Sequence, residues 1–218
     1  MNVKGIGMTS QRTRNRLIER LVAQGIEDQR VLEVIRSVPR HLFLDEALAN
    51  RAYEDVSLPI GHQQTISQPY IVARMTELLL AGKALTKVLE VGTGSGYQTA
   101  VLSQLADRVY SVERIKPLQA QARQRFRNLR LNNIHLKHAD GGFGWPERGL
   151  FDGILSCAAP EKIPEGLTDQ LAVGGRLVIP VGNARSQELW VLEKTESGVE
   201  QVAVEPVMFV PLQSGVIA

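Results

Sequence analysis

Three glycines separated by single residues follow directly on an apolar run, and this stretch limits the possible folds more than any other. The stretch is Lys87-Val-Leu-Glu-Val-Gly-Thr-Gly-Ser-Gly96. Its apolar residues predict a strand buried on both faces, and the segment from Tyr97 to Ala106 has an apolar stripe at helical spacing. The positions concerned are Val88, Leu89 and Val91 in the strand, and Ala100, Val101 and Leu105 in the helix. A strand, a tight glycine turn and a helix favour a pocket in which main-chain N–H groups contact a nucleotide.

The glycine spacing distinguishes between kinds of nucleotide site. A dinucleotide-binding turn needs a glycine three places after Gly94, where Tyr97 stands, and no Gly-Lys-Ser/Thr ending marks a P-loop. The run Glu90-Val-Gly-Thr-Gly-Ser-Gly96 instead resembles the first motif of S-adenosylmethionine-dependent methyltransferases. About twenty residues later, Glu113 ends an apolar run, where its carboxylate can accept hydrogen bonds from both ribose hydroxyls. The alternative interpretation is a plain strand-to-helix turn followed by a surface glutamate.

Strands and helices alternate through the middle of the chain. This alternation predicts a parallel sheet with helices on both faces. The last two apolar runs have only the Ser197-Gly198 turn between them and should pair as an antiparallel edge. Residues 1 to about 11 have no periodicity and are expected to form a loose arm. The expected helices have stripes at 17–22, 31–38, 71–79 and 118–129, with a short one at 164–171; the further strands are expected at 133–138, 151–156, 176–180, 188–192 and 202–210.

Two polar side chains stand where chemistry is expected. Asp140 follows a strand and precedes Gly141, so its carboxylate can accept a hydrogen bond from the amino group of adenine. The alternative is an ordinary Asp-Gly turn. Ser67 lies in a segment dense in hydroxyl and amide side chains, just before a helix opened by Pro69. It can align a substrate group by hydrogen bonding, or it can merely cap that helix.

Composition excludes several classes of protein. The 218 residues carry a formal net charge of +2, which does not by itself argue for nucleic acid. Arginines recur between Arg114 and Arg130, but no aromatic residues alternate with them, so a solvated helix face is favoured. The histidines do not form a metal site, and the single cysteine, Cys157, excludes an internal disulfide. No membrane-length apolar run or cleavable leader is evident, so we expect a cytoplasmic protein without membrane or nucleic-acid partners.

A longer motif carries a more specific resemblance. Pro59-Ile-Gly-His-Gln-Gln-Thr-Ile-Ser-Gln-Pro-Tyr70, taken with the glycine stretch, resembles the protein-L-isoaspartate O-methyltransferase family. Supporting segments run almost from end to end, among them Arg51-Ala-Tyr-Glu-Asp55, Tyr110-Ser-Val-Glu-Arg-Ile115 and Phe209-Val-Pro-Leu212. The resemblance implies methyl transfer from S-adenosyl-L-methionine to the free α-carboxylate of L-isoaspartyl, and also D-aspartyl, residues in damaged proteins, leaving S-adenosyl-L-homocysteine. The methyl ester then collapses to a succinimide, which starts repair.

The resemblance also implies a fold and a set of site residues. The fold is a doubly wound, mostly parallel seven-stranded Rossmann-like methyltransferase sheet, with an N-terminal helical extension and antiparallel C-terminal strands. One domain spans 1–218: helices and the substrate and cofactor loop in 1–80, the donor-binding core in 81–182 and strands in 183–218. The active-site serine of the family corresponds to Ser67. The implied cofactor contacts are Gln64, Thr65, Ile66, Ser67, Glu90, Gly92, Thr93, Gly94, Ser95, Gly96, Glu113, Arg114, Asp140 and Gly141.

Some residues depart from the family pattern. Gln63 replaces a usual glycine, Ala139 replaces a common glycine, and Ser156-Cys157-Ala-Ala-Pro160 is a variant of a Thr-Ala-Ala-Pro-like segment. Two other functions are alternatives to the one that the family resemblance implies. A methyltransferase acting on nucleic-acid bases would carry an Asp/Asn-Pro-Pro-Tyr/Phe signature, and Ser-Cys-Ala-Ala-Pro stands in its place. A non-catalytic adenosyl-binding module would release no methanol with an isoaspartyl peptide.

Overall fold

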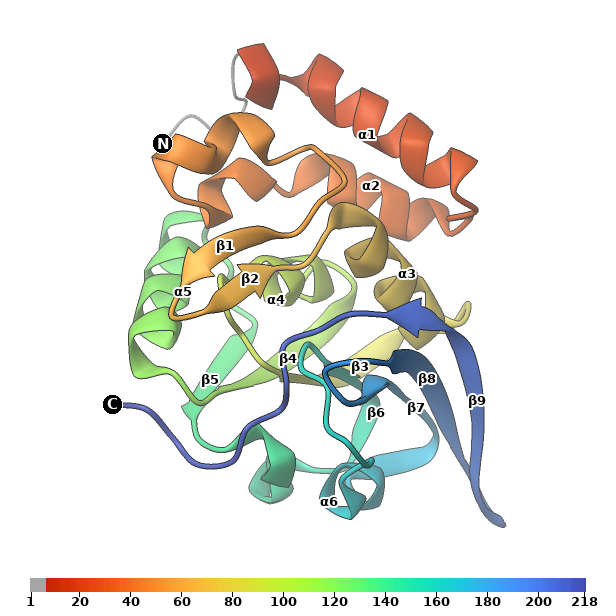
Figure 1. The fold of residues 1–218 in the computed structure, drawn as a ribbon. Helices are drawn as coiled ribbons and strands as arrows, with labels where there is room; N and C mark the ends of the chain where they lie inside the picture. Colours follow the sequence, from red (N-terminus) through yellow and green to blue (C-terminus); the bar gives the residue numbers. More distant parts are fainter. Residues whose placement is uncertain (1–6) are drawn as a thin grey trace.

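A computed structural model describes residues 7–218 of the chain (Figure 1). The α-helices are α1 (Gln11–Ala23), α2 (Gln29–Ser37), α3 (Pro69–Leu80), α4 (Tyr97–Leu102), α5 (Lys116–Asn128) and α6 (Glu165–Asp169). The strands are β1 (Leu58–Gly61), β2 (Gln64–Ile66), β3 (Leu85–Val91), β4 (Ala106–Glu113), β5 (Ile134–His138), β6 (Phe151–Ser156), β7 (Leu171–Gly182), β8 (Gln187–Thr195) and β9 (Gly198–Val207). Short 3-10 helices lie at Gly7–Thr9, Arg40–Phe43, Glu46–Arg51, Gly141–Phe143 and Pro146–Arg148.

Seven strands form the central sheet, in the order β5-β4-β3-β6-β7-β8-β9. The first five of these are parallel to one another, and β8 and β9 are antiparallel additions. The predicted Rossmann-like fold class is therefore confirmed, including the antiparallel C-terminal edge. After β3 the chain adds β4 and β5 on one side of that strand, and it then crosses back to place β6 on the other side. The carboxyl end of β3 is thus the topological switch point at which such sheets bind ligands.

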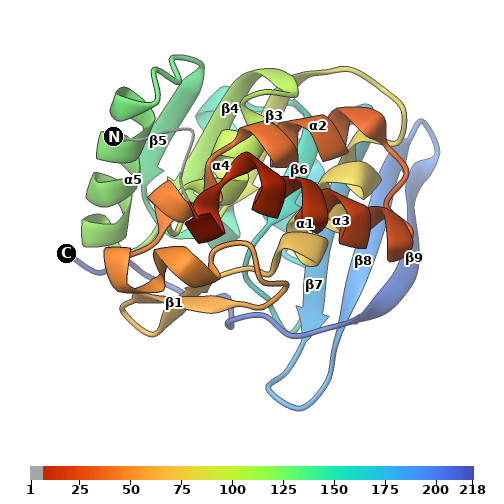
Figure 2. The same cartoon turned by 90° about the horizontal axis from the view of Figure 1, so that it is seen from above.

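The two faces of the sheet are covered unequally. Val88 of β3 packs in a large core cluster with residues of α1 to α5, for example Leu21 and Phe126. The alternate residues Leu89 and Val91 point to the other face and join a smaller cluster that includes α6. Figure 2 shows α1, α2 and α3 lying together over one side of the sheet. Alternation of side chains along β3 therefore separates the two cores.

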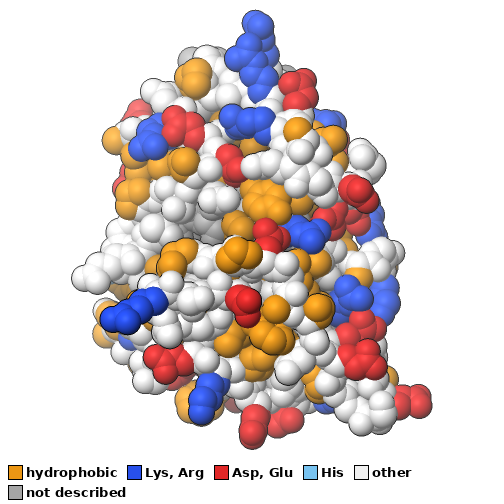
Figure 3. All heavy atoms as spheres, turned by 45° about the vertical axis from the view of Figure 1, so that its right-hand side comes forward, with side chains coloured by type: hydrophobic (Ala, Val, Ile, Leu, Met, Phe, Trp, Pro, Cys, Tyr) orange, Lys and Arg blue, Asp and Glu red, His pale blue; other side chains and the backbone are white. Residues whose placement is uncertain are grey.

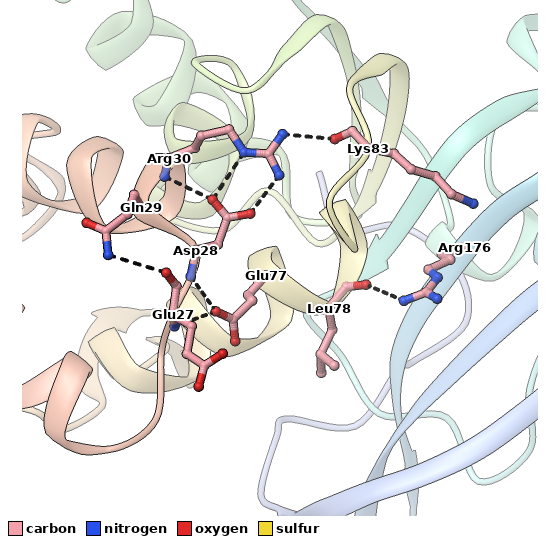
Figure 4. Close-up of polar contacts among 8 residues, drawn as sticks. All are labelled: Glu27, Asp28, Gln29, Arg30, Glu77, Leu78, Lys83 and Arg176. Carbon is pink, nitrogen blue, oxygen red and sulfur yellow. Dashed lines mark hydrogen bonds and ion pairs between the residues drawn. The ribbon is translucent and has the colours of Figure 1, made fainter.

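Hydrogen bonds fix the N-terminal helices to the rest of the molecule (Figure 4). A side-chain oxygen of Glu77, on α3, accepts the main-chain N–H groups of Glu27 and Asp28 at 2.7 and 2.8 Å. Arg30 donates to the carbonyl oxygen of Lys83 at 3.2 Å, beyond the end of α3. These contacts hold the start of α2 against α3, the helix that follows the predicted substrate loop.

Charge is mixed on the face shown in Figure 3. Acidic and basic side chains are interspersed there, with hydrophobic groups between them. A surface of mixed sign does not attract a polyanion over a long range. The charge pattern of this face therefore does not favour nucleic acid.

Several expected boundaries were wrong. The helix after the glycines ends at Leu102, so Leu105 lies outside it, and Val22 of α1 is 52% exposed rather than part of the buried stripe. Gly174 and Gly175 lie inside β7 instead of before it. A Cβ at Gly175 would lie 2.9 Å from the carbonyl oxygen of Phe151, so the glycine allows the strands to approach at a register shift. Of the expected arm, residues 1–6 lie outside the described residues, and a short 3-10 helix precedes α1.

The segment expected to be a polar loop is a hairpin made of β1 and β2. His62 and Gln63 join the two strands, with φ angles of 51° and 57°. Two consecutive positive φ angles are typical of a type I′ turn, which favours glycine and asparagine. The glycine that the family pattern has at position 63 is thereby explained. With Gln63 at this position the turn still forms, but the backbone of Gln63 is strained.

We expect Gln63→Gly to stabilise the protein by about 0.5–1 kcal/mol. Removing the Cβ relieves a left-handed conformation that costs about 1–2 kcal/mol, offset in part by the greater freedom of glycine in the unfolded chain. Thermal denaturation should show a midpoint higher by about 2 °C. Gln121→Gly is the matched control, because this exposed residue lies inside α5 and the change should lower stability by about 1 kcal/mol. A lower midpoint for Gln63→Gly would contradict the strained turn.

Candidate active site

A pocket opens at the carboxyl ends of β3, β4 and β6. With its open mouth it holds about 830 Å³ of empty space. Its walls come from the hairpin, the glycine loop, the end of β4, the turn after β5, the end of β6 and the C-terminal segment. Predicted site residues in these walls are Gln64, Thr65, Ile66, Ser67, Gly92, Thr93, Gly94, Ser95, Glu113, Arg114 and Gly141. The fold therefore brings together most of the residues predicted from sequence.

The three glycines serve different local purposes. All have positive φ angles, 92° at Gly92, 51° at Gly94 and 90° at Gly96. A Cβ on Gly94 would make only an ordinary contact with the Ile60 side chain, at 3.4 Å, so its positive φ angle is what favours glycine there. A Cβ on Gly96 would lie 2.7 Å from the ring of Phe126. Gly96 does not line the pocket, and its lack of a side chain serves the packing of α4 on α5.

Glu113 is held in the pocket wall by the main chain. Only 5% of the residue is exposed, and one carboxylate oxygen accepts the N–H of Gly94 at 2.8 Å. The other oxygen accepts the N–H of Ile115 at 2.9 Å. A carboxylate offers about four acceptor positions, so further acceptor capacity is left on the pocket side. Fixed geometry and this remaining capacity fit the hydroxyl groups of a ribose.

Glu90 lies behind the glycine loop and does not line the pocket. It is fully buried, and one oxygen accepts the hydroxyls of Thr99 and Ser111, both at 2.5 Å. Ser111 in turn shares a 2.6 Å hydrogen bond with Thr93 of the loop. Burial raises the pKa of Glu90 to about 8, although the hydroxyl groups act in the opposite direction. Through these hydrogen bonds, Glu90 connects the glycine loop to α4 and β4.

We expect Glu90→Gln to flatten the dependence of stability on pH. The pKa in the folded protein, about 8, lies above the ordinary carboxyl value, so the folded state binds more protons than the unfolded state between about pH 4.5 and 8. Stability should then fall through that window by up to about 1.4 kcal/mol per pH unit. Urea denaturation at pH 5 and pH 8 measures this slope. The exposed Glu46→Gln is the control, and an equal slope in wild type and Glu90→Gln would refute the assignment.

Asp140 and Arg114 both contact the C-terminal segment. One oxygen of Asp140 accepts the N–H of Gly142 at 2.9 Å, and the other accepts the N–H of Gly215 at 2.6 Å. The carboxylate does not line the pocket, whereas Gly141 does. Arg114 donates to the side-chain oxygen of Gln213 at 3.0 Å. The Asp-Gly turn is therefore present, and it is tied to a distant part of the chain.

Ser67 lies between β2 and α3. The N-cap position of α3 is Gln68, and among the described residues no hydrogen bond joins the Ser67 hydroxyl to the first turn of the helix. The capping alternative is thus not supported. Ser67 instead lines both the pocket and a second cavity beside it, lined by Ser57, Thr65, Ser67, Gln68, Ile71, Cys157, Pro206, Val207, Met208, Phe209 and Val210. Four residues, Thr65, Ser67, Cys157 and Val210, are common to the two cavities.

Sequence reasoning missed one contribution to this site, that of Cys157, and anticipated part of another. Cys157 was interpreted as a semi-buried thiol, which it is, but it also lies in the wall between the cavities. Burial, reinforced by the carboxylates of Glu90 and Glu113, raises the pKa of the Cys157 thiol well above its ordinary value, which keeps it neutral. The segment from Val210 to Gln213 forms part of the pocket wall. From the sequence, the peptide substrate was expected to lie across residues 57–68 and the Val210-Pro-Leu segment, and the structure places this segment in the wall of the first pocket.

The described residues contain neither a metal-binding cluster nor a membrane-spanning helix. Among residues 7–218, no group of three or more His, Cys, Asp or Glu side chains could hold a metal ion. Within the same range, none of the helices has both the length and the apolar character needed to cross a bilayer. Arg125, one of the arginines of α5, donates to the carbonyl oxygen of Ser95 at 3.0 Å and so supports the glycine loop.

The fold and the pocket together define a class. A Rossmann-like sheet with a glycine loop at its switch point, and with an acidic side chain fixed at the next strand end, is the architecture of a protein that binds a nucleotide or nucleoside ligand there. The family model described as protein-L-isoaspartate(D-aspartate) O-methyltransferase matches residues 11–216. The chain therefore belongs to the protein-L-isoaspartate(D-aspartate) O-methyltransferase family and is a methyltransferase.

Individual relatives agree with this assignment. Protein-L-isoaspartate O-methyltransferase 1 of Marinobacter nauticus is 64% identical over 215 residues, which cover 99% of this chain and 98% of the relative. The protein-L-isoaspartate O-methyltransferase of Cellvibrio japonicus is also 64% identical, over 98% and 96% of the two chains. A putative enzyme of this kind from Plasmodium falciparum, solved with S-adenosyl-L-homocysteine, has a TM-score of 0.78 at 28% identity, covering 92% of this chain and 98% of that one. Another solved protein-L-isoaspartate O-methyltransferase has a TM-score of 0.81 at 27% identity; the match covers 91% of this chain but 65% of that longer one.

Proposed function

We propose that this protein transfers a methyl group from S-adenosyl-L-methionine to the free α-carboxylate of L-isoaspartyl residues, and of D-aspartyl residues, in damaged proteins and peptides. The observation that carries the proposal is the meeting of two cavities at Thr65, Ser67, Cys157 and Val210. One cavity contains the glycine loop and Glu113 and suits the donor. The other is open and is lined by polar side chains, such as Ser57 and Gln68, together with apolar ones, such as Ile71, which suits an extended peptide.

The chemistry explains why no general base is needed. The donor supplies a methyl group on a positively charged sulfur. The acceptor carboxylate is already ionised at neutral pH, because its ordinary pKa is about 3.5. Opposite charges cancel as the methyl group moves, so a pocket poor in water favours the reaction. The protein therefore has to align the acceptor oxygen, the methyl carbon and the sulfur.

The roles of the side chains follow from this requirement. The hydroxyl of Ser67 can donate one neutral hydrogen bond to the acceptor carboxylate, which orients it without removing its charge. Glu113 would accept the ribose hydroxyls, while the Gly92 to Ser95 main chain would lie along the donor. Gly141 would contact the adenine, and Asp140 would hold the turn that presents it. Cys157 stays neutral beside the transfer position, which prevents a thiolate from competing for the methyl group.

The products are S-adenosyl-L-homocysteine and a methyl ester that closes spontaneously to a succinimide, from which normal aspartate can form. We place this repair activity in the cytoplasm, since a chain with one cysteine suits a reducing compartment. The solved Plasmodium falciparum relative was crystallised with S-adenosyl-L-homocysteine, and this supports the choice of donor.

Methanol release tests the proposal. Purified protein with radiolabelled S-adenosyl-L-methionine should release labelled methanol from an isoaspartyl peptide and none from the same peptide with normal aspartate. Tight binding of S-adenosyl-L-homocysteine without methanol release would indicate a non-catalytic binding module. Transfer of label to an oligonucleotide in place of the peptide would indicate a base methyltransferase. Either result would overturn the proposal.

A further inference from the structure

The chain after β9 crosses the sheet as an extended segment, which we call the C-terminal strap (residues 208–217). Figure 1 shows it running from the end of β9 past the carboxyl ends of the strands to the side where α5 and β5 lie. Near its start, the N–H of Ala159 donates to Val210, and the N–H of Leu212 donates to Ala159, both at 2.8 Å. Residues 210–213 of the strap line the donor pocket. The strap is therefore one wall of that pocket.

The far end of the strap is held by the same residues that are predicted to contact the donor. The N–H of Gly215 donates to Asp140 at 2.6 Å. Arg114 donates through its guanidinium to Gln213 at 3.0 Å, and its carbonyl oxygen accepts the N–H of Ile217 at 2.7 Å. Residues on both sides of the pocket thus hold the strap.

His138 completes this arrangement. It is the last residue of β5, and its Nε2 lies 3.0 Å from the carbonyl oxygens of both Arg114 and Ile217. Both partners are acceptors, so Nε2 carries the proton and its N–H is shared between them. One imidazole therefore joins the end of β5, the residue after β4 and the strap.

We propose that His138 is a positioning residue of the donor site, which holds the C-terminal strap closed and so sets how long the donor stays bound. The proposal rests on the proposed function, because it takes the pocket to be the donor site. Arg114 and Gln213, which hydrogen-bond to each other, both line the pocket, so a bound donor lies against the closed strap. The bound donor therefore favours the closed strap, and the closed strap favours binding of the donor. Release of the donor requires the strap to open.

Hydrogen exchange and ligand dissociation test the proposal. Adding S-adenosyl-L-homocysteine to wild type should slow exchange of the Gly215 and Ile217 amides at least tenfold. His138→Leu should remove most of this protection and raise the dissociation rate of S-adenosyl-L-homocysteine about tenfold. His138→Gln, which keeps an N–H donor, should recover part of the slow dissociation. Turnover at saturating donor should not fall, since no group beside the acceptor changes.

His135→Leu is the matched control. His135 lies on the same strand but stacks on Tyr110, with ring centroids 4.8 Å apart, and it makes no hydrogen bond to the strap among the described residues. The dissociation rate of S-adenosyl-L-homocysteine from His135→Leu should match the rate from wild type. A rate for His138→Leu within twofold of wild type, or unchanged exchange at Gly215 and Ile217 on ligand binding, would overturn the inference. Failure of wild type to bind S-adenosyl-L-homocysteine would instead overturn the proposed function.

Discussion

Ser67→Ala is expected to lower kcat/KM for an isoaspartyl peptide about 100-fold while leaving the affinity for S-adenosyl-L-homocysteine within about threefold. The reason is that the hydroxyl lies where the two cavities meet, so its loss releases the acceptor carboxylate from the in-line position. A misplacement of about 1 Å costs about 100-fold in rate. The donor keeps its contacts with the glycine loop and Glu113. Steady-state methanol release and calorimetric titration measure the two quantities separately.

Two further variants sharpen this result. Ser67→Thr keeps the hydroxyl and should retain more activity than Ser67→Ala. Ser57→Ala removes a hydroxyl that lines only the second cavity, so its kcat/KM should stay within about threefold of wild type. Equal losses of donor affinity and turnover in Ser67→Ala would show that the serine supports the pocket in general. The role of Ser67 in aligning the acceptor would then be wrong.

The core of the sheet was predictable because its signals are local. Strand β6 has the expected bounds, Phe151–Ser156, since its apolar residues Phe151, Ile154 and Leu155 lie between turn-forming segments of the chain. Glu113 ends β4 as expected, and pairing of Val91 with Val112 brings it beside the glycine loop. Adjacent parallel strands place their carboxyl ends at one edge of the sheet. Spacing along the chain was therefore enough to predict which loops meet.

The errors arise where contacts between distant residues decide the structure. Gly174 and Gly175 have low strand propensity, yet β7 continues through them because β6 approaches closely at that point. The C-terminal strap has no periodicity, and its partners Asp140 and Ala159 lie far away in the sequence. The individual glycines also could not be distinguished in sequence. Only the structure separates Gly94, which faces the hairpin, from Gly96, which faces α5.

Glu113→Ala is expected to weaken S-adenosyl-L-homocysteine binding about 10- to 100-fold, with kcat at saturating donor within about threefold of wild type. A hydrogen bond to a charged group contributes about 1.5–3 kcal/mol, and a tenfold change in affinity corresponds to about 1.4 kcal/mol. The carboxylate also accepts two main-chain N–H groups, those of Gly94 and Ile115, so its removal loosens the glycine loop. Acceptor alignment by Ser67 should persist once donor is bound.

Calorimetry measures the affinity, and thermal denaturation separates it from a loss of folding. Glu113→Gln keeps one acceptor oxygen for Gly94 or for the ribose, so its affinity should fall between those of wild type and Glu113→Ala. Glu147→Ala removes an exposed carboxylate that pairs with Lys137 outside the pocket and should bind as wild type does. Unchanged affinity in a folded Glu113→Ala protein would mean that the ribose contacts another group. The opposite patterns expected for Ser67 and Glu113 assign donor binding and acceptor alignment to different walls of the pocket.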